Sequence, residues 1–185
     1  MDRRTFLRRA GLGSIAVASA PGVVGALATP ARADDGFRFR FVALATAGDI
    51  EGVQHRLIIH GNGRFDDSSI RGFGTWAHIN LADPDPATNV LASGKWRPTN
   101  LVRFDLEGIY AEVLAAGVLE TEVFLKRVFP EPGTFEGTLT VVCDIPPGGL
   151  DAPGNAGIVL SIDGAPVGPF TQLAGLTIFV PPLDD

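Results

Sequence analysis

The three histidines of the chain are the side chains best suited to chemistry at neutral pH. His55, His60 and His78 lie in two neighbouring stretches in which polar and apolar residues alternate. Imidazoles on adjacent strands can bind a transition metal or move protons. Whether these three do so depends on how the two stretches pair.

We expect residues 53–60 and 70–80 to form an antiparallel pair joined by a short turn. That pairing places His60 and His78 on one face, about four residues apart. At roughly 3.3 Å per residue, this separation is too large for shared metal ligation. His55 falls on the opposite, apolar face. The sequence therefore predicts no metal site and no cofactor, with His55 as an ionisable group among apolar neighbours.

Trp76 shares its strand parity with Gly72 and Gly74. Two interpretations stay open. The indole could form the floor of a ligand pocket, for which the glycines leave room, or it could fill the space that they vacate. Trp76 and His55 are the candidate ligand-binding residues.

Other chemistry is poorly supported, and we predict no catalytic residue. The chain lacks the nucleophile-elbow, zinc-protease, C-x-x-C and phosphate-loop motifs. The short run from Gly61 to Gly63 is explained by a tight turn. The carboxylate pairs lie in loops or on a polar strand face, where solvated side chains are expected. These pairs are Asp66 with Asp67, Asp83 with Asp85, and Glu120 with Glu122.

The single cysteine, Cys143, cannot form an internal disulfide. It could be a reactive thiol. However, it shares its strand parity with Leu139 and Val141, so we expect a small buried apolar residue.

The elements that must position these side chains are strands, because the hydrophobic period is two almost everywhere. The expected strands cover residues 37–45, 53–60, 69–81, 90–96, 101–106, 119–129, 135–143, 157–162 and 176–180. Residues 109–117 carry the one helix signal, a short turn closed by Gly117.

The hairpin around Pro132 shows the pattern most clearly. A turn centred there pairs Phe129 with Phe135 and Val123 with Val141, so apolar residues meet on one face. Eight or nine short strands joined by hairpins predict an all-β fold, an antiparallel β-barrel of about eight strands. A β-sandwich is the alternative.

The first 33 residues have the features of a targeting segment. Arg3 and Arg4 precede Phe6 and Leu7, a weakly apolar stretch follows, and Ala31 and Ala33 form a small-x-small cleavage site. This run resembles the twin-arginine signal peptide, which implies export of a folded protein to an extracytoplasmic location in a prokaryote or plastid. An uncleaved membrane anchor is the alternative. We expect residues 34–185 to form one secreted domain.

The charge of that domain limits its partners. The leader holds five of the fifteen basic residues and one of the twenty-one acidic ones, so residues 34–185 carry a net charge near −10. Such a surface repels phosphate backbones and anionic lipids. We expect no nucleic-acid partner, and contact with a membrane only in transit. The sequence does not determine an oligomeric state.

The region after the leader resembles small secreted bacterial all-β proteins. Three functions follow as hypotheses. The first is a non-catalytic barrel that binds a small apolar ligand or a partner surface. The second is an isomerase or cyclase, similar to dirigent or allene-oxide-cyclase barrels in architecture. The third is a structural envelope protein. Because few ionisable groups are expected inside, the pattern favours binding over catalysis.

The leader gives a direct prediction. Replacing both Arg3 and Arg4 by Lys should abolish export, since the arginine pair is the defining feature of the motif. Immunoblots of cytoplasmic and exported fractions measure this, and intact mass should place the mature start at Asp34. Normal export of the double variant would show that another route serves.

Overall fold

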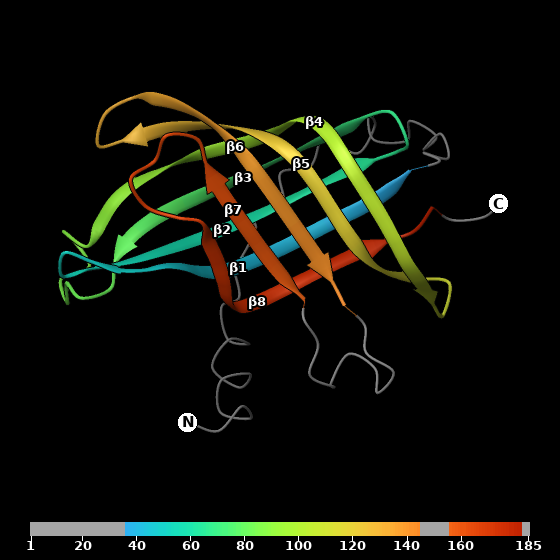
Figure 1. Ribbon diagram of the computed structural model, residues 1–185, viewed down its shortest axis with the longest axis horizontal. Coiled ribbons are helices and arrows are strands. Elements are labelled where there is room, and N and C mark those ends of the chain that lie inside the picture. The colour runs from blue at the N-terminus through green and yellow to red at the C-terminus, as the bar shows by residue number, and fades with distance from the viewer. Residues whose placement is uncertain (1–35, 145–155, 183–185) are drawn as a thin grey trace, which may run out of the picture. The chain divides into compact units, whose positions relative to one another are not determined.

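The computed structural model describes residues 36–144 and 156–182, and the leader residues discussed above lie outside that part. The described residues form strands and connections, with no helix. The strands are β1 (Phe37–Ile50), β2 (Val53–Phe65), β3 (Ile70–Asn80), β4 (Val90–Tyr110), β5 (Leu114–Phe129), β6 (Gly133–Cys143), β7 (Gly157–Ile162) and β8 (Phe170–Val180) (Figure 1).

Each strand pairs antiparallel with the next, and β8 pairs with β1 to close the sheet. The predicted eight-stranded barrel is therefore confirmed, and the sandwich alternative is wrong. β5 also pairs with β8 at one position, where Ala115 lies opposite Phe179. No helix of the described residues is long and apolar enough to cross a membrane.

The alternation in β1 shows how the sequence builds the barrel wall. Phe39, Phe41 and Ala43 point inward and are buried, while Arg38 and Arg40 point to solvent. Because successive strand residues face opposite sides, one period-two pattern serves the core and the surface together. The same alternation in the other strands completes the core.

Aromatic rings fill one half of the barrel interior. Trp96 is 3% exposed and lies over the cross-strand pair formed by Gly61 and Gly74. A Cβ atom on either glycine would overlap the indole, whose Nε1 donates to the carbonyl oxygen of His60 at 3.0 Å. The tight turn expected at Gly61 is therefore wrong. These residues continue β2, and the glycines make room for a ring from another strand.

Phenylalanines extend this packing toward the end of the barrel where β1 begins. Phe41 stacks on Trp96 with ring centroids 5.7 Å apart. Phe65 contacts Phe104 and Phe179 edge to face, at 4.6 and 6.1 Å. Aromatic pairs of this kind add to the stabilisation from burial alone. We call Trp96 and these four phenylalanines the aromatic plug.

β4 differs from the expectation. Residues 90–96 and 101–106 belong to one strand that passes through Pro98. The strand pairs with β3 only as far as Trp96, so the missing N–H of Pro98 falls beyond that ladder. Several bulges in its pairing with β5 absorb the irregularity.

The helix expected over residues 109–117 is also wrong. Ala111 and Glu112 have φ values of 49° and 60°, and the N–H of Val113 donates to the carbonyl of Tyr110 at 3.2 Å. This is a two-residue hairpin turn of the primed type, which favours Asn-Gly. The sequence has no Asn-Gly pair here, and the spacing of apolar residues within 109–117 resembled that of a helix.

The β5–β6 hairpin keeps the expected face but not the expected register. Phe135 lies opposite Leu125, and Val141 opposite Leu119, because the turn is centred on Pro130 rather than on Pro132. An even shift preserves parity, so Cys143 is buried as predicted, and burial raises the pKa of its thiol. Phe129 is exposed, contrary to expectation.

The plug gives a stability prediction. Gly61→Ala should lower the free energy of unfolding by about 1–3 kcal/mol, because the new methyl group displaces the Trp96 ring. Chemical denaturation followed by tryptophan fluorescence measures the change.

Gly108→Ala is the matched control. It also changes a strand glycine, but its nearest neighbour, Tyr110, is at an ordinary 3.4 Å. We expect a change within about 0.5 kcal/mol. Equal effects of the two substitutions would contradict the role given to the glycine at position 61.

Candidate functional site

A cavity of about 370 Å³ opens at the end of the barrel opposite the plug. Its size lies within the usual range of small-molecule sites. Most of its walls are apolar, with Leu57, Trp76, Phe135, Ile162 and Phe170 among the contributors. The remaining lining residues are His78, Ala92, Arg127 and the loop residues 163–167.

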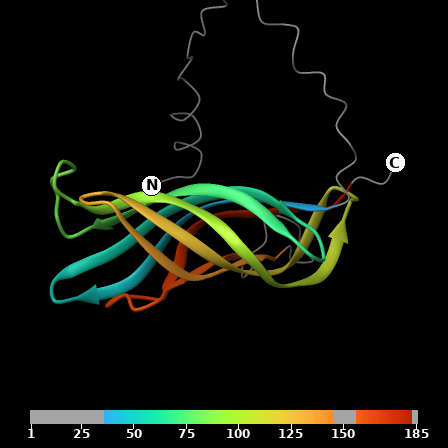
Figure 2. The ribbon, with the colours of Figure 1, turned by 90° about the horizontal axis from the view of Figure 1, so that it is seen from above.

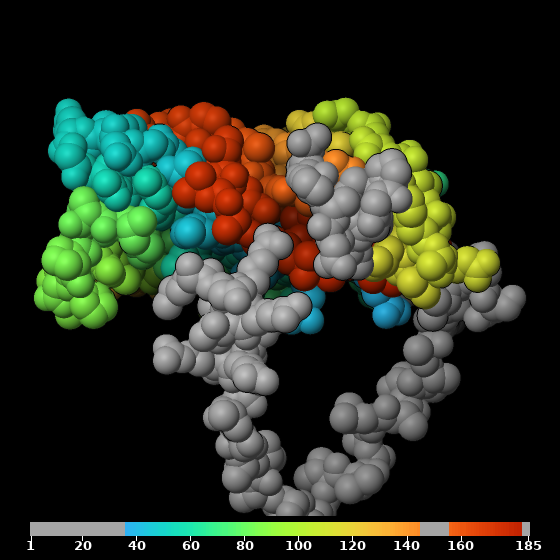
Figure 3. All heavy atoms as spheres, turned by 90° about the horizontal axis from the view of Figure 1, so that it is seen from below, coloured from blue at the N-terminus to red at the C-terminus, as the bar shows by residue number. Residues whose placement is uncertain are grey.

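Four connections gather at this end of the barrel. They are the β1–β2 turn, the β3–β4 loop, the β5–β6 turn and the β7–β8 loop, as two perpendicular views show (Figures 1 and 2). The first two project beyond the barrel wall in cyan and green (Figure 3). The β7–β8 loop supplies residues 163–167 to the cavity lining. Binding sites often lie where loops meet at the mouth of a barrel.

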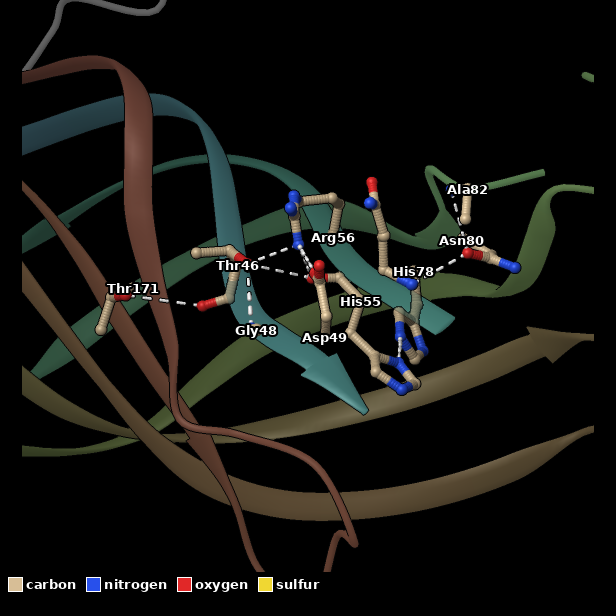
Figure 4. A network of polar contacts seen from close by, with 10 residues as sticks. Thr46, Gly48, Asp49, His55, Arg56, His78, Asn80, Ala82 and Thr171 are labelled. Carbon is tan, nitrogen blue, oxygen red and sulfur yellow. Dashed lines mark hydrogen bonds and ion pairs between the residues drawn. The ribbon is translucent and has the colours of Figure 1, made fainter. Parts of the chain in front are cut away.

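Two histidines meet at this mouth. His55 Nδ1 lies 2.8 Å from His78 Nε2, and the ring centroids are 5.0 Å apart (Figure 4). The expectation that His60 shares a face with His78 is wrong. His60 is exposed and bonds to the Thr75 hydroxyl at 2.6 Å.

The correction has a simple origin in strand register. His60 pairs with Thr75, one residue further along than we expected. Because strand side chains alternate, a slip of one residue moves each side chain to the other face relative to its partner strand. The predicted inward position of His55, beside Leu57 and Ile59, is confirmed.

Backbone contacts hold His55 in place. Its carbonyl oxygen accepts hydrogen bonds from the Arg56 guanidinium at 3.0 Å and from the Thr46 hydroxyl at 3.3 Å (Figure 4). The β1–β2 ladder is irregular between Thr46 and Gly48, opposite this point. Such irregularities re-aim side chains next to binding sites. Arg56 also approaches Asp49 at 3.4 Å.

The His78 ring of the pair is uncharged at neutral pH. Burial, and then the proximity of His55, lower the pKa of His78 to about 4. The bond between the rings needs one donor and one acceptor nitrogen. Protonating both rings would set two N–H groups against each other. The pair therefore suits hydrogen bonding or the movement of a single proton.

Trp76 lies in the wall of the cavity. It is 7% exposed, and its Nε1 donates to the carbonyl oxygen of Lys95 at 3.2 Å. The indole therefore offers an apolar face with its polar group already satisfied. The space above Gly74 is filled by Trp96 instead.

Sequence reasoning missed Arg127. It is the last inward-facing residue of β5, on the same parity as Val123 and Leu125. Its Nε donates to the carbonyl oxygen of Glu131 at 2.8 Å, and its Cζ lies 5.3 Å from the ring centroid of Phe135. Strand parity was the signal that could have found it.

Two of the carboxylates expected to be solvated make structural contacts instead. Asp66 accepts hydrogen bonds from the backbone and hydroxyls of Ser68 and Ser69, which lower its pKa to about 2. Glu120 pairs with Arg103 at 2.8 Å. Within residues 36–144 and 156–182, no three His, Cys, Asp or Glu side chains gather as metal ligands would.

Comparison with known proteins adds no relatives. No family model, no curated protein and no solved structure matches this chain.

The lowered pKa of the half-buried His78 predicts a pH-dependent stability. In the unfolded chain His78 binds a proton below about pH 6.5, whereas in the fold it does so only near pH 4. The unfolded state therefore gains protons first, and stability should fall as the pH drops from 6.5 to 4. Partial exposure of the ring reduces this loss to on the order of 1–2 kcal/mol.

Denaturation midpoints measured across this range test the assignment. His78→Gln should flatten the decline, since its side chain does not titrate. His60→Gln removes a histidine from the outer face of β2 and is the control. A decline of unchanged steepness in the His78 variant would contradict this account.

Proposed function

We propose that this protein is an exported barrel that binds a small, mainly apolar molecule in the cavity at its open end. The observation that carries the proposal is the 370 Å³ cavity with apolar walls and few polar groups. Export by the twin-arginine route is proposed from the leader alone.

The division of the interior supports binding. The plug keeps one half of the barrel filled, so a ligand meets a closed floor rather than a channel. Rigid aromatic walls such as Trp76 and Phe170 contribute contact area at little entropic cost. Small barrels are commonly either packed with side chains or hollow enough for one ligand. This barrel combines the two.

A second candidate is an isomerase or cyclase. The observation that favours it is the contact of His78 with His55 in the wall of an apolar cavity, because ionisable groups in such surroundings mark catalytic sites. Mass spectrometry of molecules before and after incubation with the protein distinguishes the two functions. A binding protein returns its ligand unchanged.

Blocking the cavity tests the proposal. Ala92 lies in the lining, opposite His78 on the neighbouring strand. Ala92→Phe should weaken binding of Nile red, a neutral apolar dye, about tenfold or more, because the new ring occupies the ligand space. Fluorescence titration of purified residues 34–185 measures the affinity.

Ala77→Phe is the matched control. Ala77 pairs with Ser93 but does not line the cavity, so the same substitution there should leave the affinity unchanged. Dye binding that is equal in the two variants would place the dye elsewhere and remove the support for this site.

A further inference from the structure

We infer that the cavity selects apolar molecules that carry one carboxylate, and that Arg127 receives it. This inference rests on the proposed ligand-binding function and names the class of ligand. It follows from the position, the orientation and the unused hydrogen-bond donors of this side chain.

Arg127 is held ready for an anion. The hydrogen bond from its Nε to the Glu131 carbonyl oxygen and its position over the Phe135 ring hold the guanidinium in place. Within the described part of the chain, its two terminal nitrogens have no hydrogen-bond partner and no ion pair. A planar guanidinium with free terminal N–H groups matches the two oxygens of a carboxylate.

The charges around the cavity favour this choice. Arg127 is the one Lys or Arg among the lining residues. The lowered pKa of His78 keeps that imidazole neutral near pH 7. Asp163 also borders the cavity, but it is exposed, whereas Arg127 is half buried. Water and salt screen the exposed carboxylate more strongly than the half-buried cation.

The position of Arg127 also separates head from tail. Arg127 belongs to the last pair of the β5–β6 ladder, opposite Gly133, while Leu57 and Trp76 lie on β2 and β3 in the apolar wall. A ligand can therefore insert its apolar body and leave its carboxylate at the rim. A cavity of this size suits a medium-length chain or a small ring system.

Three probes of equal chain length test the inference: decanoate, decanol and decylammonium. Titration calorimetry of residues 34–185 should show decanoate binding at least about tenfold more tightly than decanol, with decylammonium weakest. The net charge near −10 favours the cation overall, so preference for decanoate must come from a local group.

Arg127→Gln should reduce decanoate affinity to that of decanol and leave decanol unchanged. Arg127→Lys should restore part of the difference, because it keeps the charge without the planar fork. Arg97→Gln is the matched control, since Arg97 makes a similar contact, 5.2 Å from the Phe124 centroid, away from the cavity lining. It should behave as the unaltered protein.

The outcomes separate the two proposals. Equal affinity of the unaltered protein for decanoate and decanol overturns the carboxylate inference and leaves ligand binding intact. If Arg127→Gln lowers the affinity for decanoate and for decanol equally, the carboxylate inference is also overturned and ligand binding again stays intact. Failure of all three probes, together with failure of Nile red, overturns the binding function itself. The comparison of probes on the unaltered protein does not depend on the folding of any variant.

Discussion

The fit of Trp96 onto Gly61 and Gly74 is the constraint on which the rest of the interior depends. An eight-stranded barrel has just enough room for inward side chains, so a large ring needs glycines on the facing strands. Here β2 and β3 place glycines opposite each other, and β4 supplies the indole that covers them. Phe41 stacks on that ring, and the other phenylalanines of the plug continue the packing toward the end where β1 begins. The packing of the filled half is thus centred on the contact of Trp96 with these two glycines.

The open half follows from this arrangement. With the aromatic rings gathered at one end, the inward residues near the β7–β8 loop leave 370 Å³ unfilled. The few polar side chains at that mouth differ in character. His78 is neutral and hydrogen-bonded to His55, whereas Arg127 is charged and its terminal N–H groups are free to donate to a ligand. An apolar cavity with one neutral and one cationic group discriminates between ligands mainly by the charge of their head group.

The sequence could predict the fold because the relevant signal is local. Alternation in residues 37–45 and 119–125 identifies strands and their buried faces without knowledge of partners. Parity also predicted the burial of Cys143 and the inward position of His55. It survived an incorrect register in the β5–β6 hairpin, because the error there was an even number of residues. The same logic could have exposed Arg127, which lies on the buried parity of β5.

The sequence by itself therefore determined that this is a β-barrel, which faces of its strands are buried, and that its first 33 residues resemble an export signal. Tertiary structure alone decided which side chains meet. One residue of register between β2 and β3 places His78 on the face of His55 rather than on the face of His60. The pairing of β3 with β4 decides that Trp96, and not Trp76, covers Gly74. Hydrophobic alternation has a period of two, so it does not select among registers that differ by an even number of residues. Register depends on turn geometry and on the fit of rings against glycines from distant strands.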